Sequence, residues 1–383
     1  MRLISIQNAN LLQEFTEREI IMNEIHTERF ERVTQNLAAM GLTQMVVSDP
    51  PTIFYLTGVR IFHPGERMLA LLLKADGGHR MFVNALFGTP DTDIPVENYR
   101  DGEDAPAKLL PWLDKDKPLG IDKNWPARFL LRLMELNAAP AYQNASAACD
   151  DARAIKDEAE QAAMRASSKV NDDCMAEFAA LIRPGVTEKQ MAEEIKAIYA
   201  AHGCSGVSFE PICGFGAHAA DPHHGNDDTP LTAGQCVLID VGGVYRDYCS
   251  DMTRTFFTAE PTEEERKVYE LVRQAQAAAE ALVKPGIRLC DIDAAARDII
   301  TAAGYGPYFN HRLGHFIGLE DHEAGDVSAV NENVVVPGMC FSIEPGIYLP
   351  GKFGVRIEDL VRVTEDGCEV LNHYPHELTV KNI

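Results

Sequence analysis

Four acidic residues of this 383-residue chain stand within or directly after apolar, strand-like segments, where an unpaired charge is costly to bury. They are Asp240, Asp251, Glu344 and Glu358. Carboxylates that converge repel one another unless cations lie between them, and hard oxygen ligands favour divalent ions such as manganese, magnesium or cobalt. The four residues are therefore candidate ligands of a metal site.

The segment between the first two carboxylates contains glycines and polar residues, which predicts a strand, a turn and a returning strand. A turn centred between Tyr245 and Arg246 would place Asp240 directly opposite Asp251. Opposed strand residues have Cβ atoms about 4.5–5.5 Å apart. That spacing suits two carboxylates that meet at a pair of metal ions, which lie about 3.5–4 Å apart in two-metal sites.

The second pair of carboxylates lies in similar segments. Glu344 ends an apolar strand and is followed by Pro-Gly, and Glu358 lies in the alternating run Val355–Val361. Side chains two positions apart on a strand share a face, so Glu358 lies on the same face as Arg356, whereas Asp359 points the other way. This alternation selects Glu358 as the candidate ligand.

Histidines near these carboxylates would shift the preference toward transition metals. His311, His315 and His322 fall within a short segment whose glycines allow close approach of the backbone to a ligand, and His223 precedes the first acidic strand. A single histidine is more often a core or surface residue than a ligand. The case for a metal site comes from the equivalent places that these pieces occupy in an internal duplication.

An internal repeat would position these residues. Segments 183–186 (Arg-Pro-Gly-Val) and 284–287 (Lys-Pro-Gly-Ile) each precede a helical pattern that ends at a glycine, and in each copy 18 positions separate the first glycine from the last. Segments 234–240 and 338–344 then repeat an apolar strand that ends in a carboxylate, and the two offsets, 101 and 104, nearly agree. The sequence therefore predicts two copies of a helix–helix–strand unit with pseudo-twofold symmetry.

The rest of the chain predicts the domain organisation. Residues 1–22 lack clear patterning and are interpreted as a disordered extension, residues 23–152 as an α/β domain, and residues 153–383 as the duplicated domain. The helix and strands expected in the α/β domain are Thr27–Met40, and Gln44–Val47, Leu69–Lys74, Met81–Asn84 and Leu119–Asp122. A long helix from Asp157 to Ile182 is expected to open the duplicated domain.

Composition argues against several classes of protein. The formal charge of −23 opposes binding to nucleic acid, because phosphates require positive charge. No stretch approaches the roughly 20 apolar residues that span a bilayer, so no membrane partner is expected. The nine cysteines are scattered singly without a CxxC pair, which favours free thiols in a reducing cytoplasm over disulfides or zinc–thiolate sites.

Five ordered motifs resemble those of the prolidase, aminopeptidase P and methionine aminopeptidase superfamily. They are Arg153-x-Ile-Lys156-Asp157-Glu158, the run from Asp240-Val-Gly-Gly to Asp251-Met-Thr-Arg254, the run from His311-x-x-Gly-His315 to His322-Glu323, Ser342-Ile-Glu344-Pro-Gly, and Val355-Arg356-Ile-Glu358-Asp359. The resemblance covers about residues 26–383. It implies a creatinase-like α/β N-terminal domain, an α+β catalytic domain with the duplicated pita-bread fold, and a homodimer.

The resemblance also implies two divalent metal ions, manganese foremost, with cobalt, iron or zinc as alternatives. By position, the five metal ligands would be Asp240, Asp251, His315, Glu344 and Glu358. Asp251 and Glu358 would bridge the ions, Asp240 would bind one of them, and His315 and Glu344 would bind the other. Hydroxide held between the ions would attack the scissile carbonyl of a small peptide substrate.

Further roles follow from the same resemblance. Glu344 would carry a proton toward the leaving imino nitrogen, and His322 and His223 would donate hydrogen bonds to the tetrahedral intermediate. His223, His311 and His322 would line the substrate site. Arg356, on the face shared with the last ligand, is also expected to bind substrate.

The family branch with such an N-terminal domain usually hydrolyses the peptide bond before proline, and the modest chain length favours an Xaa-Pro dipeptidase (prolidase). Aminopeptidase P, which acts on longer peptides, is the nearest alternative. A non-peptide C–N hydrolase or lyase on the same fold is another, and a metal-free binding module is a fourth interpretation, which the five intact ligand positions oppose.

Two departures from the family pattern bear on the substrate. Phe316 stands where relatives often have glycine, and residues 324–326 (Ala-Gly-Asp) replace a segment that often contains proline. Asp326 would repel a substrate carboxylate if it faced the cavity. Three residues of the first domain are candidates to bind that carboxylate instead: Arg60, His63 and Arg67.

Overall fold

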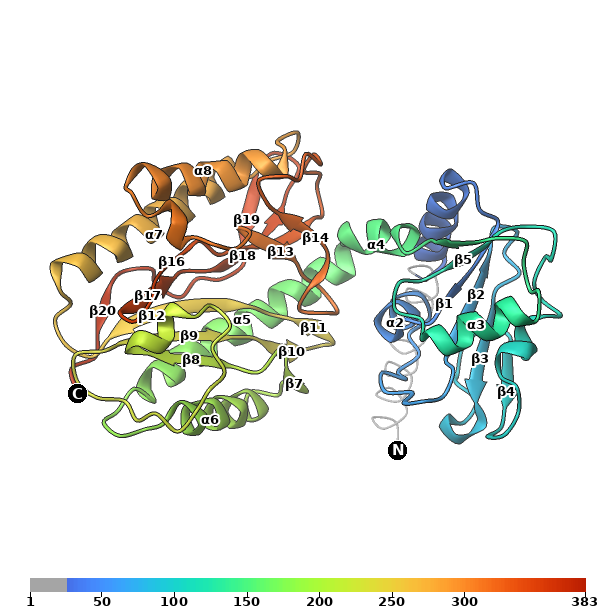
Figure 1. Cartoon of the computed structure of the whole chain (residues 1–383), viewed down its shortest axis with the longest axis horizontal. Helices are drawn as coiled ribbons and strands as arrows, with labels where there is room; N and C mark the ends of the chain where they lie inside the picture. The colour runs from blue at the N-terminus through green and yellow to red at the C-terminus, as the bar shows by residue number, and fades with distance from the viewer. Residues whose placement is uncertain (1–25) are drawn as a thin grey trace, which may run out of the picture. The chain divides into compact units, whose positions relative to one another are not determined.

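The structure, a computed structural model, describes residues 26–383, so the extension expected at residues 1–22 lies outside the described part (Figure 1). The chain divides into two compact units, Met1–Arg153 and Ala154–Ile383. Among the described residues, no helix combines the length and the apolar character that crossing a membrane requires.

A six-stranded mixed sheet forms the centre of the N-terminal unit. The strands are β1 (Gln44–Val47), β2 (Ala70–Lys74), β3 (Arg80–Asn84), β4 (Val96–Tyr99), β5 (Leu119–Ile121) and β6 (Tyr142–Asn144), and the helices are a segment at 26–39, α2 (Pro50–Thr57), α3 (Ala127–Glu135) and α4 (Ala147–Ala154), with 3₁₀ turns η1 (Ala85–Phe87) and η2 (Pro106–Leu109). The order is β4-β3-β2-β1-β5-β6. Every residue of β1 is buried, as expected for a central strand covered on both faces. The predicted α/β character, the first helix and the four strands are confirmed.

The C-terminal unit contains the predicted duplication. One copy contributes α5 (Glu158–Ala180) and α6 (Glu188–Ala201), and the other contributes α7 (Glu263–Leu282) and α8 (Leu289–Ala302). Helices α5, α6 and α7 each begin with a capping box, in which an Asp or Thr side chain and a Glu or Gln side chain bind each other's backbone N–H groups. Each helix pair leads to a buried strand, β9 (Cys236–Val241) or β15 (Cys340–Ile343); Asp240 lies near the end of β9, and Glu344 directly follows β15.

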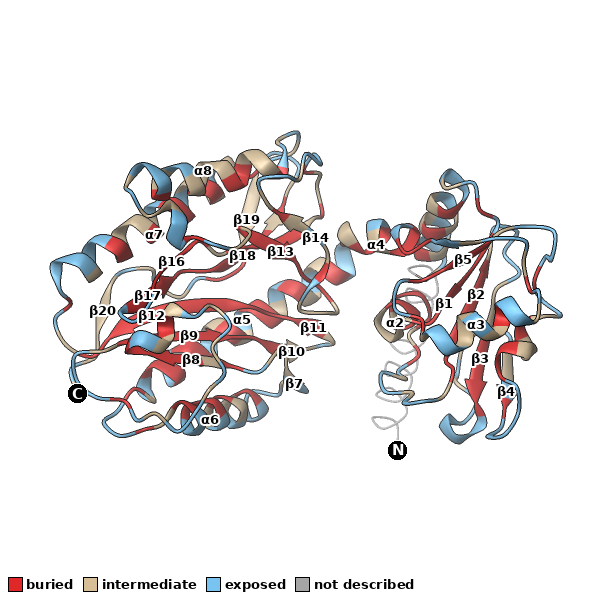
Figure 2. Ribbon diagram, in the orientation of Figure 1, coloured by how far each residue is buried: buried red, intermediate tan, exposed pale blue. Residues whose placement is uncertain are grey.

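The helices of this unit enclose its strands. The remaining elements are β7 (Gly206–Val207), β8 (Ile212–Phe215), β10 (Gly243–Tyr245), β11 (Tyr248–Cys249), β12 (Met252–Phe257), β13 (Gly314–Phe316), β14 (Glu323–Val327), β16 (Gly346–Leu349), β17 (Phe353–Arg356), β18 (Asp359–Val363), β19 (Cys368–Val370) and β20 (Thr379–Val380), with 3₁₀ turns η3 (Gly216–Ala220) and η4 (Gly306–Tyr308). Two larger sheets have the orders β20-β12-β9-β8 and β14-β13-β15-β18-β19. In Figure 1 the strands lie between α7 and α8 on one side and α6 on the other, and Figure 2 shows that central strands such as β9 and β12 are buried, whereas β7, β19 and β20 are not.

The hairpin that carries the first two carboxylates has a register different from the predicted one. Asp240 pairs with Thr253 instead of Asp251. The turn is centred between Arg246 and Asp247, which have φ values of 52° and 70°. A two-residue turn of this kind requires positive φ at both central residues, which aspartate tolerates far better than the preceding tyrosine would. Asp251 therefore approaches Asp240 diagonally.

The run that carries the second pair is not one continuous strand. β17 ends at Arg356 and β18 begins at Asp359, so Ile357 and Glu358 lie between strands that belong to different sheets. Glu344 occupies the corresponding gap between β15 and β16. In both places the chain changes its pairing partner, which frees the carboxylate-bearing residue from a ladder position and directs it to the centre of the unit.

A buried ion pair joins the beginning of this unit to one of its histidine-containing segments. Lys156 Nζ lies 2.7 Å from Glu323 Oε2, with side chains only 1% and 5% exposed. Glu323 Oε1 also accepts a hydrogen bond from the backbone N–H of Leu319. Removing one member of such a pair leaves an uncompensated buried charge, which is strongly destabilising.

We therefore expect Lys156→Met to lower the free energy of unfolding by about 3–5 kcal/mol in urea titrations. The matched control is Lys169→Met, which removes an exposed pair with Asp173 on α5 and should leave the transition midpoint unchanged. Equal midpoints for Lys156→Met and the wild type would contradict the importance of the buried pair.

Candidate functional site

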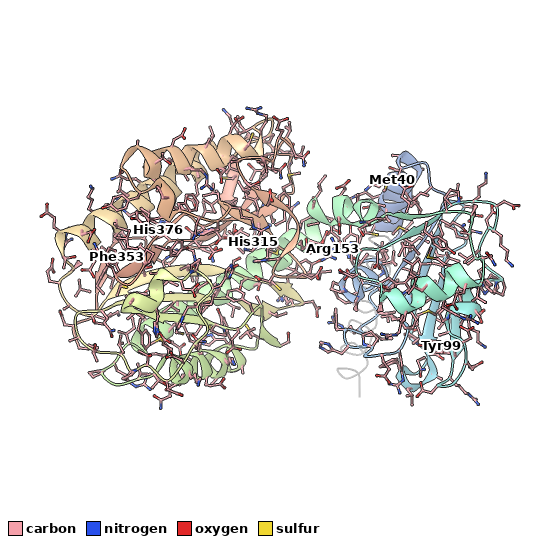
Figure 3. All side chains as sticks on the ribbon, in the orientation of Figure 1. Met40, Tyr99, Arg153, His315, Phe353 and His376 are labelled. Atoms are coloured by element: carbon pink, nitrogen blue, oxygen red, sulfur yellow. The ribbon has the colours of Figure 1, made fainter. Side chains whose placement is uncertain are left out.

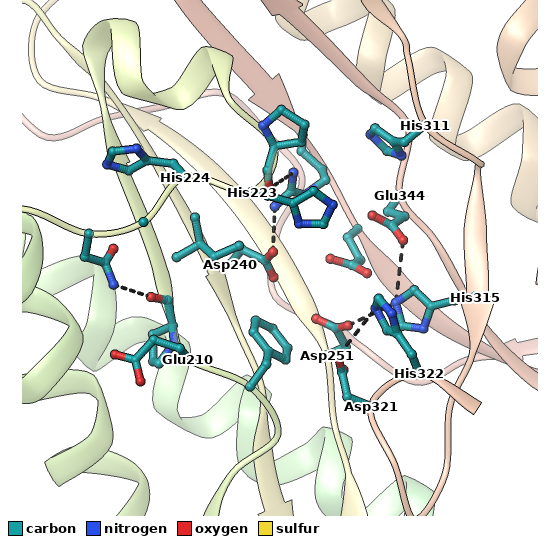
Figure 4. Close-up of a pocket in the computed structure, with 18 of the residues that line it drawn as sticks. Glu210, His223, His224, Asp240, Asp251, His311, His315, Asp321, His322 and Glu344 are labelled. Carbon is teal, nitrogen blue, oxygen red and sulfur yellow. Dashed lines mark hydrogen bonds and ion pairs between the residues drawn. The ribbon is translucent and has the colours of Figure 1, made fainter. Parts of the chain in front are cut away.

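The nine site residues predicted in the duplicated domain all line one cavity of about 440 Å³ in the C-terminal unit, a volume typical of small-molecule sites. They are Asp240, Asp251, His315, Glu344, Glu358, His223, His311, His322 and Arg356. Figure 3 shows His315 inside this unit among its strands. In the close-up of Figure 4, the side chains of Asp240 and His223, from the first copy, face those of His315 and Glu344, from the second.

The carboxylates of the cavity are buried without enough protein partners. Asp240, Asp251 and Glu358 are 8%, 3% and 2% exposed. Among the described residues, Asp240 Oδ1 and Asp251 Oδ1 have no hydrogen-bond partner. A buried carboxylate oxygen without a donor is costly, and a bound cation would supply the missing interaction. These orphaned oxygens fit the expected metal ions.

His315 is placed and protonated as a metal ligand requires. Its Nε2 atom lies 3.4 Å from Asp251 Oδ2 and 3.5 Å from Glu344 Oε1, distances longer than those of good hydrogen bonds but typical of two ligands of one ion. Its Nδ1 atom lies 3.2 Å from the carbonyl oxygen of Phe316, which favours a proton on Nδ1 and a free lone pair on Nε2. Burial, and then the neighbouring His322, lowers the pKa of His315 well below its usual value, so the ring is neutral.

The electrostatics of the cavity favour added positive charge. Burial, followed by the charges of Glu358 and Asp240, raises the pKa of the Asp251 carboxyl well above its usual value. Burial and the nearby Glu344 raise the pKa of Glu358 in the same way. Burial, opposed by Arg356, raises the pKa of Glu344 to about 8. Without cations, these carboxyls retain protons at pH values where exposed carboxyls are ionised.

Three of the predicted substrate-side residues have distinct environments. The Nε2 atom of His311 lies 2.9 Å from the hydroxyl of Tyr348, and burial lowers the pKa of His311 to about 3, which keeps its ring neutral. His322 is exposed, with 52% of its side chain accessible, and its ring centroid lies 3.9 Å from that of His315. His223 lines the facing side of the cavity (Figure 4).

Arg356 lines the cavity, but its guanidinium already donates hydrogen bonds to protein atoms. Its nitrogens lie 2.5 Å from Asp240 Oδ2, 2.8 Å from the hydroxyl of Tyr348 and 3.0 Å from the hydroxyl of Thr253. Only 3% of the residue is exposed. The arrangement makes Arg356 a positioning residue for Asp240, because the ion pair leaves Asp240 Oδ1 as the oxygen that can meet a cation.

Asp321 and Arg312 are among the cavity residues that the sequence analysis did not single out. Asp321 Oδ2 lies 3.4 Å from Nε2 of His322, and burial, with Asp240 nearby, raises the pKa of Asp321 to about 7. Both residues flank β13, whose pairing with β14 shifts register after His315, so strand alternation could not indicate which side chains face inward. The one sequence feature that could have indicated them is that they are adjacent to His311 and His322 in the chain.

The two departures from the family pattern compensate each other in packing. Phe316 lies in the core, and a Cβ atom at Gly325 would come within 2.7 Å of its ring, so the aromatic residue requires glycine at 325. Asp326 accepts hydrogen bonds from Ser328 and Asn331 and is not among the residues that line the cavity. The predicted repulsion of a substrate by Asp326 therefore does not arise. Arg67 has protein partners, with Asp101 at 2.8 Å.

A second group of potential metal ligands, Glu188, His218 and His224, is a closed hydrogen-bond network. The buried Glu188 carboxylate lies 2.9 Å from His218 Nδ1 and 2.7 Å from His224 Nε2, and accepts the backbone N–H groups of Phe215 and Asp227. These are hydrogen-bond distances, whereas the 3.4–3.5 Å separations around His315 leave room for an ion. The network anchors the segment next to the predicted substrate histidine at 223.

Comparisons with known proteins cover both units. Residues 29–155 match the creatinase/prolidase N-terminal domain, and residues 162–365 match metallopeptidase family M24. The chain is 36% identical over 357 residues to an uncharacterized peptidase of Staphylococcus haemolyticus. The aligned region covers 90% of this chain and 99% of the relative. It is similar to the crystal structure of a dipeptidase from Mycobacterium ulcerans (TM-score 0.88, 36% identity, 94% of this chain and 99% of that one) and to that of a prolidase from Thermococcus sibiricus (TM-score 0.89, 32% identity, 93% and 99%). The predicted superfamily, with its creatinase-like and pita-bread domains, is confirmed.

Proposed function

The chain belongs to metallopeptidase family M24, and we propose that it is an Xaa-Pro dipeptidase that works with two divalent metal ions. The observation that supports this most is the convergence of five candidate ligands on one buried cavity: Asp240, Asp251, His315, Glu344 and Glu358. The similar solved structures include a dipeptidase and a prolidase, each matched along nearly its whole length.

The five residues would hold both ions, with Asp251 and Glu358 between them, Asp240 on one, and His315 with Glu344 on the other. When bound, two divalent cations supply Lewis acidity and activate water for attack at neutral pH. Four oxygen donors and one nitrogen form a mainly hard set of ligands, which is why manganese is the expected metal.

The chain's own residues would orient the peptide and move protons. Glu344 is 15% exposed toward the cavity and can pass a proton to the leaving imino nitrogen. Because Arg312 can only donate, its 3.3 Å contact makes Nδ1 of His322 an acceptor and puts the ring proton on Nε2. That N–H can stabilise the developing oxyanion, together with His223.

Metal-stripped protein should be assayed with and without added manganese or cobalt against Ala-Pro, Ala-Pro-Ala and Ala-Ala. We expect manganese-dependent release of proline from Ala-Pro alone. Comparable cleavage of the tripeptide would instead support aminopeptidase P. If protein that has bound two metals cleaves none of the three peptides, the peptidase proposal fails and a C–N hydrolase or lyase becomes the better hypothesis.

A further inference from the structure

Two arginines line the substrate cavity, and their surroundings differ. The guanidinium of Arg356 is buried and bound to a carboxylate and two hydroxyls, as described above. Arg312 is partly exposed, and its Nη2 atom donates a hydrogen bond of 3.3 Å to Nδ1 of His322. Within residues 26–383, no carboxylate lies within ion-pair distance of Arg312. At the edge of the cavity it therefore presents a positive charge that is not directly paired, although its field reaches the carboxyls of Asp321 and Glu344 at longer range.

The absence of an ion partner distinguishes Arg312 from other arginines of the same unit. Arg254 is paired with Asp359 at 2.7 Å, and Arg297 binds Asp293 through two nitrogens. A guanidinium carries five N–H donors in a planar fork that matches a carboxylate with two parallel hydrogen bonds. With one nitrogen at His322, the rest of the fork of Arg312 is available to an anion in the cavity.

The position of Arg312 relative to the metal ligands indicates which anion this is. His322 lies between them: its ring is 3.9 Å from that of His315, and its Nδ1 atom contacts Arg312. If His322 donates to the scissile carbonyl, the guanidinium lies on the far side of that histidine from the reacting bond. In a dipeptide, a single residue, about 3.3 Å of extended chain, separates the scissile bond from the terminal carboxylate.

We propose that Arg312 binds the free α-carboxylate of the substrate and thereby restricts the enzyme to dipeptides. This inference rests on the proposed dipeptidase function and adds a specificity-determining residue to it. A longer peptide would place a neutral amide where the carboxylate of a dipeptide lies, and would lose the charge-assisted hydrogen bonds with the guanidinium.

The test compares Ala-Pro with Ala-Pro amide, which lacks the negative charge, in the manganese-loaded wild type and in Arg312→Met and Arg312→Lys. Arg312→Met is expected to lower the ratio of kcat/KM for Ala-Pro to kcat/KM for the amide by about 10- to 100-fold, mainly through KM. Arg312→Lys should recover part of the ratio, because it keeps the charge without the fork. The control Arg273→Met removes a half-exposed arginine of α7, outside the cavity, and should leave the ratio unchanged.

Because only the ratio is compared, a general loss of activity in a variant does not imitate the expected result. Metal content and melting temperature should match the wild type, which checks that Arg312→Met is folded. If the wild type cleaves Ala-Pro and Arg312→Met has the same ratio of kcat/KM values as the wild type, the inference is overturned and the proposed function is left intact. If the metal-loaded wild type cleaves neither substrate, the proposed function itself fails, and the inference with it.

Discussion

Replacing Asp251 with asparagine is expected to abolish binding of the metal pair and to lower kcat/KM for Ala-Pro by at least about 1000-fold. The same substitution is expected to make the metal-free protein more stable, by about 1–3 kcal/mol. Asp251 is 3% exposed, one of its oxygens has no hydrogen-bond partner among the described residues, and burial and the charges of Glu358 and Asp240 raise its pKa. Asparagine has nearly the same shape without the charge, so it relieves the repulsion and removes the ligand.

Three measurements on one variant check this result: metal content after dialysis, peptidase kinetics, and thermal unfolding in the presence of a chelator. The control is Asp298→Asn, which removes an exposed carboxylate of α8 and should change none of them. An Asp251→Asn protein that still retains two metal ions would show that Asp251 is not a ligand. A metal-free variant that melts below the wild type would show that the buried carboxylate is stabilised by protein contacts alone.

Without metals, the protein is expected to lose stability as the pH rises from about 5 to 8, and manganese is expected to reverse that trend. Burial raises the pKa of Glu344 to about 8 and that of Asp321 to about 7. The folded metal-free protein therefore holds protons that the unfolded chain, with carboxyl pKa values near about 4, has already released. Between these values, each such group lowers the free energy of unfolding by about 1.4 kcal/mol per pH unit, and its stabilising contribution is complete only below the unfolded pKa.

Manganese changes the sign because it binds the carboxylates as anions and competes with protons for them, so stabilisation by the metal grows with pH. Urea unfolding across this pH range, with chelator and with excess manganese, measures both slopes. Glu280, outside the cavity, also has a pKa raised by burial to about 8 and contributes the same slope in both conditions. The control Glu280→Gln should therefore shift both slopes equally. Identical slopes with and without manganese would contradict a carboxylate-based metal site.

Much of the fold could be read from local signals in the sequence. Proline-glycine pairs, glycines at helix C-termini and apolar periodicity act over a few residues, and they predicted the helices of both copies and the first strands of the N-terminal unit. The duplication could be recognised because both copies have a Pro-Gly pair before a helix and a glycine after it. The convergence of Asp240 and Glu344 followed from their equivalent positions at the ends of β9 and β15.

The tertiary structure alone decided what surrounds each site residue. The register that pairs Asp240 with Thr253 depends on which residues of the turn tolerate positive φ, a choice that shifts pairing by whole residues and that alternation does not reveal. Strand alternation placed Arg356 on the face of the metal ligands, but its partner is Asp240, which lies 116 positions away in the sequence.

Arg312 and Asp321 are cavity residues that the sequence pattern did not reveal. They lie in the irregular segments before and after β13, so no local period indicates that they face the cavity. The sequence by itself determined the family, the domain types and the set of candidate ligands, because those depend on residue type and order. Which charges are paired, orphaned or free to meet a substrate depends on contacts between distant segments, and only the folded chain brings those together.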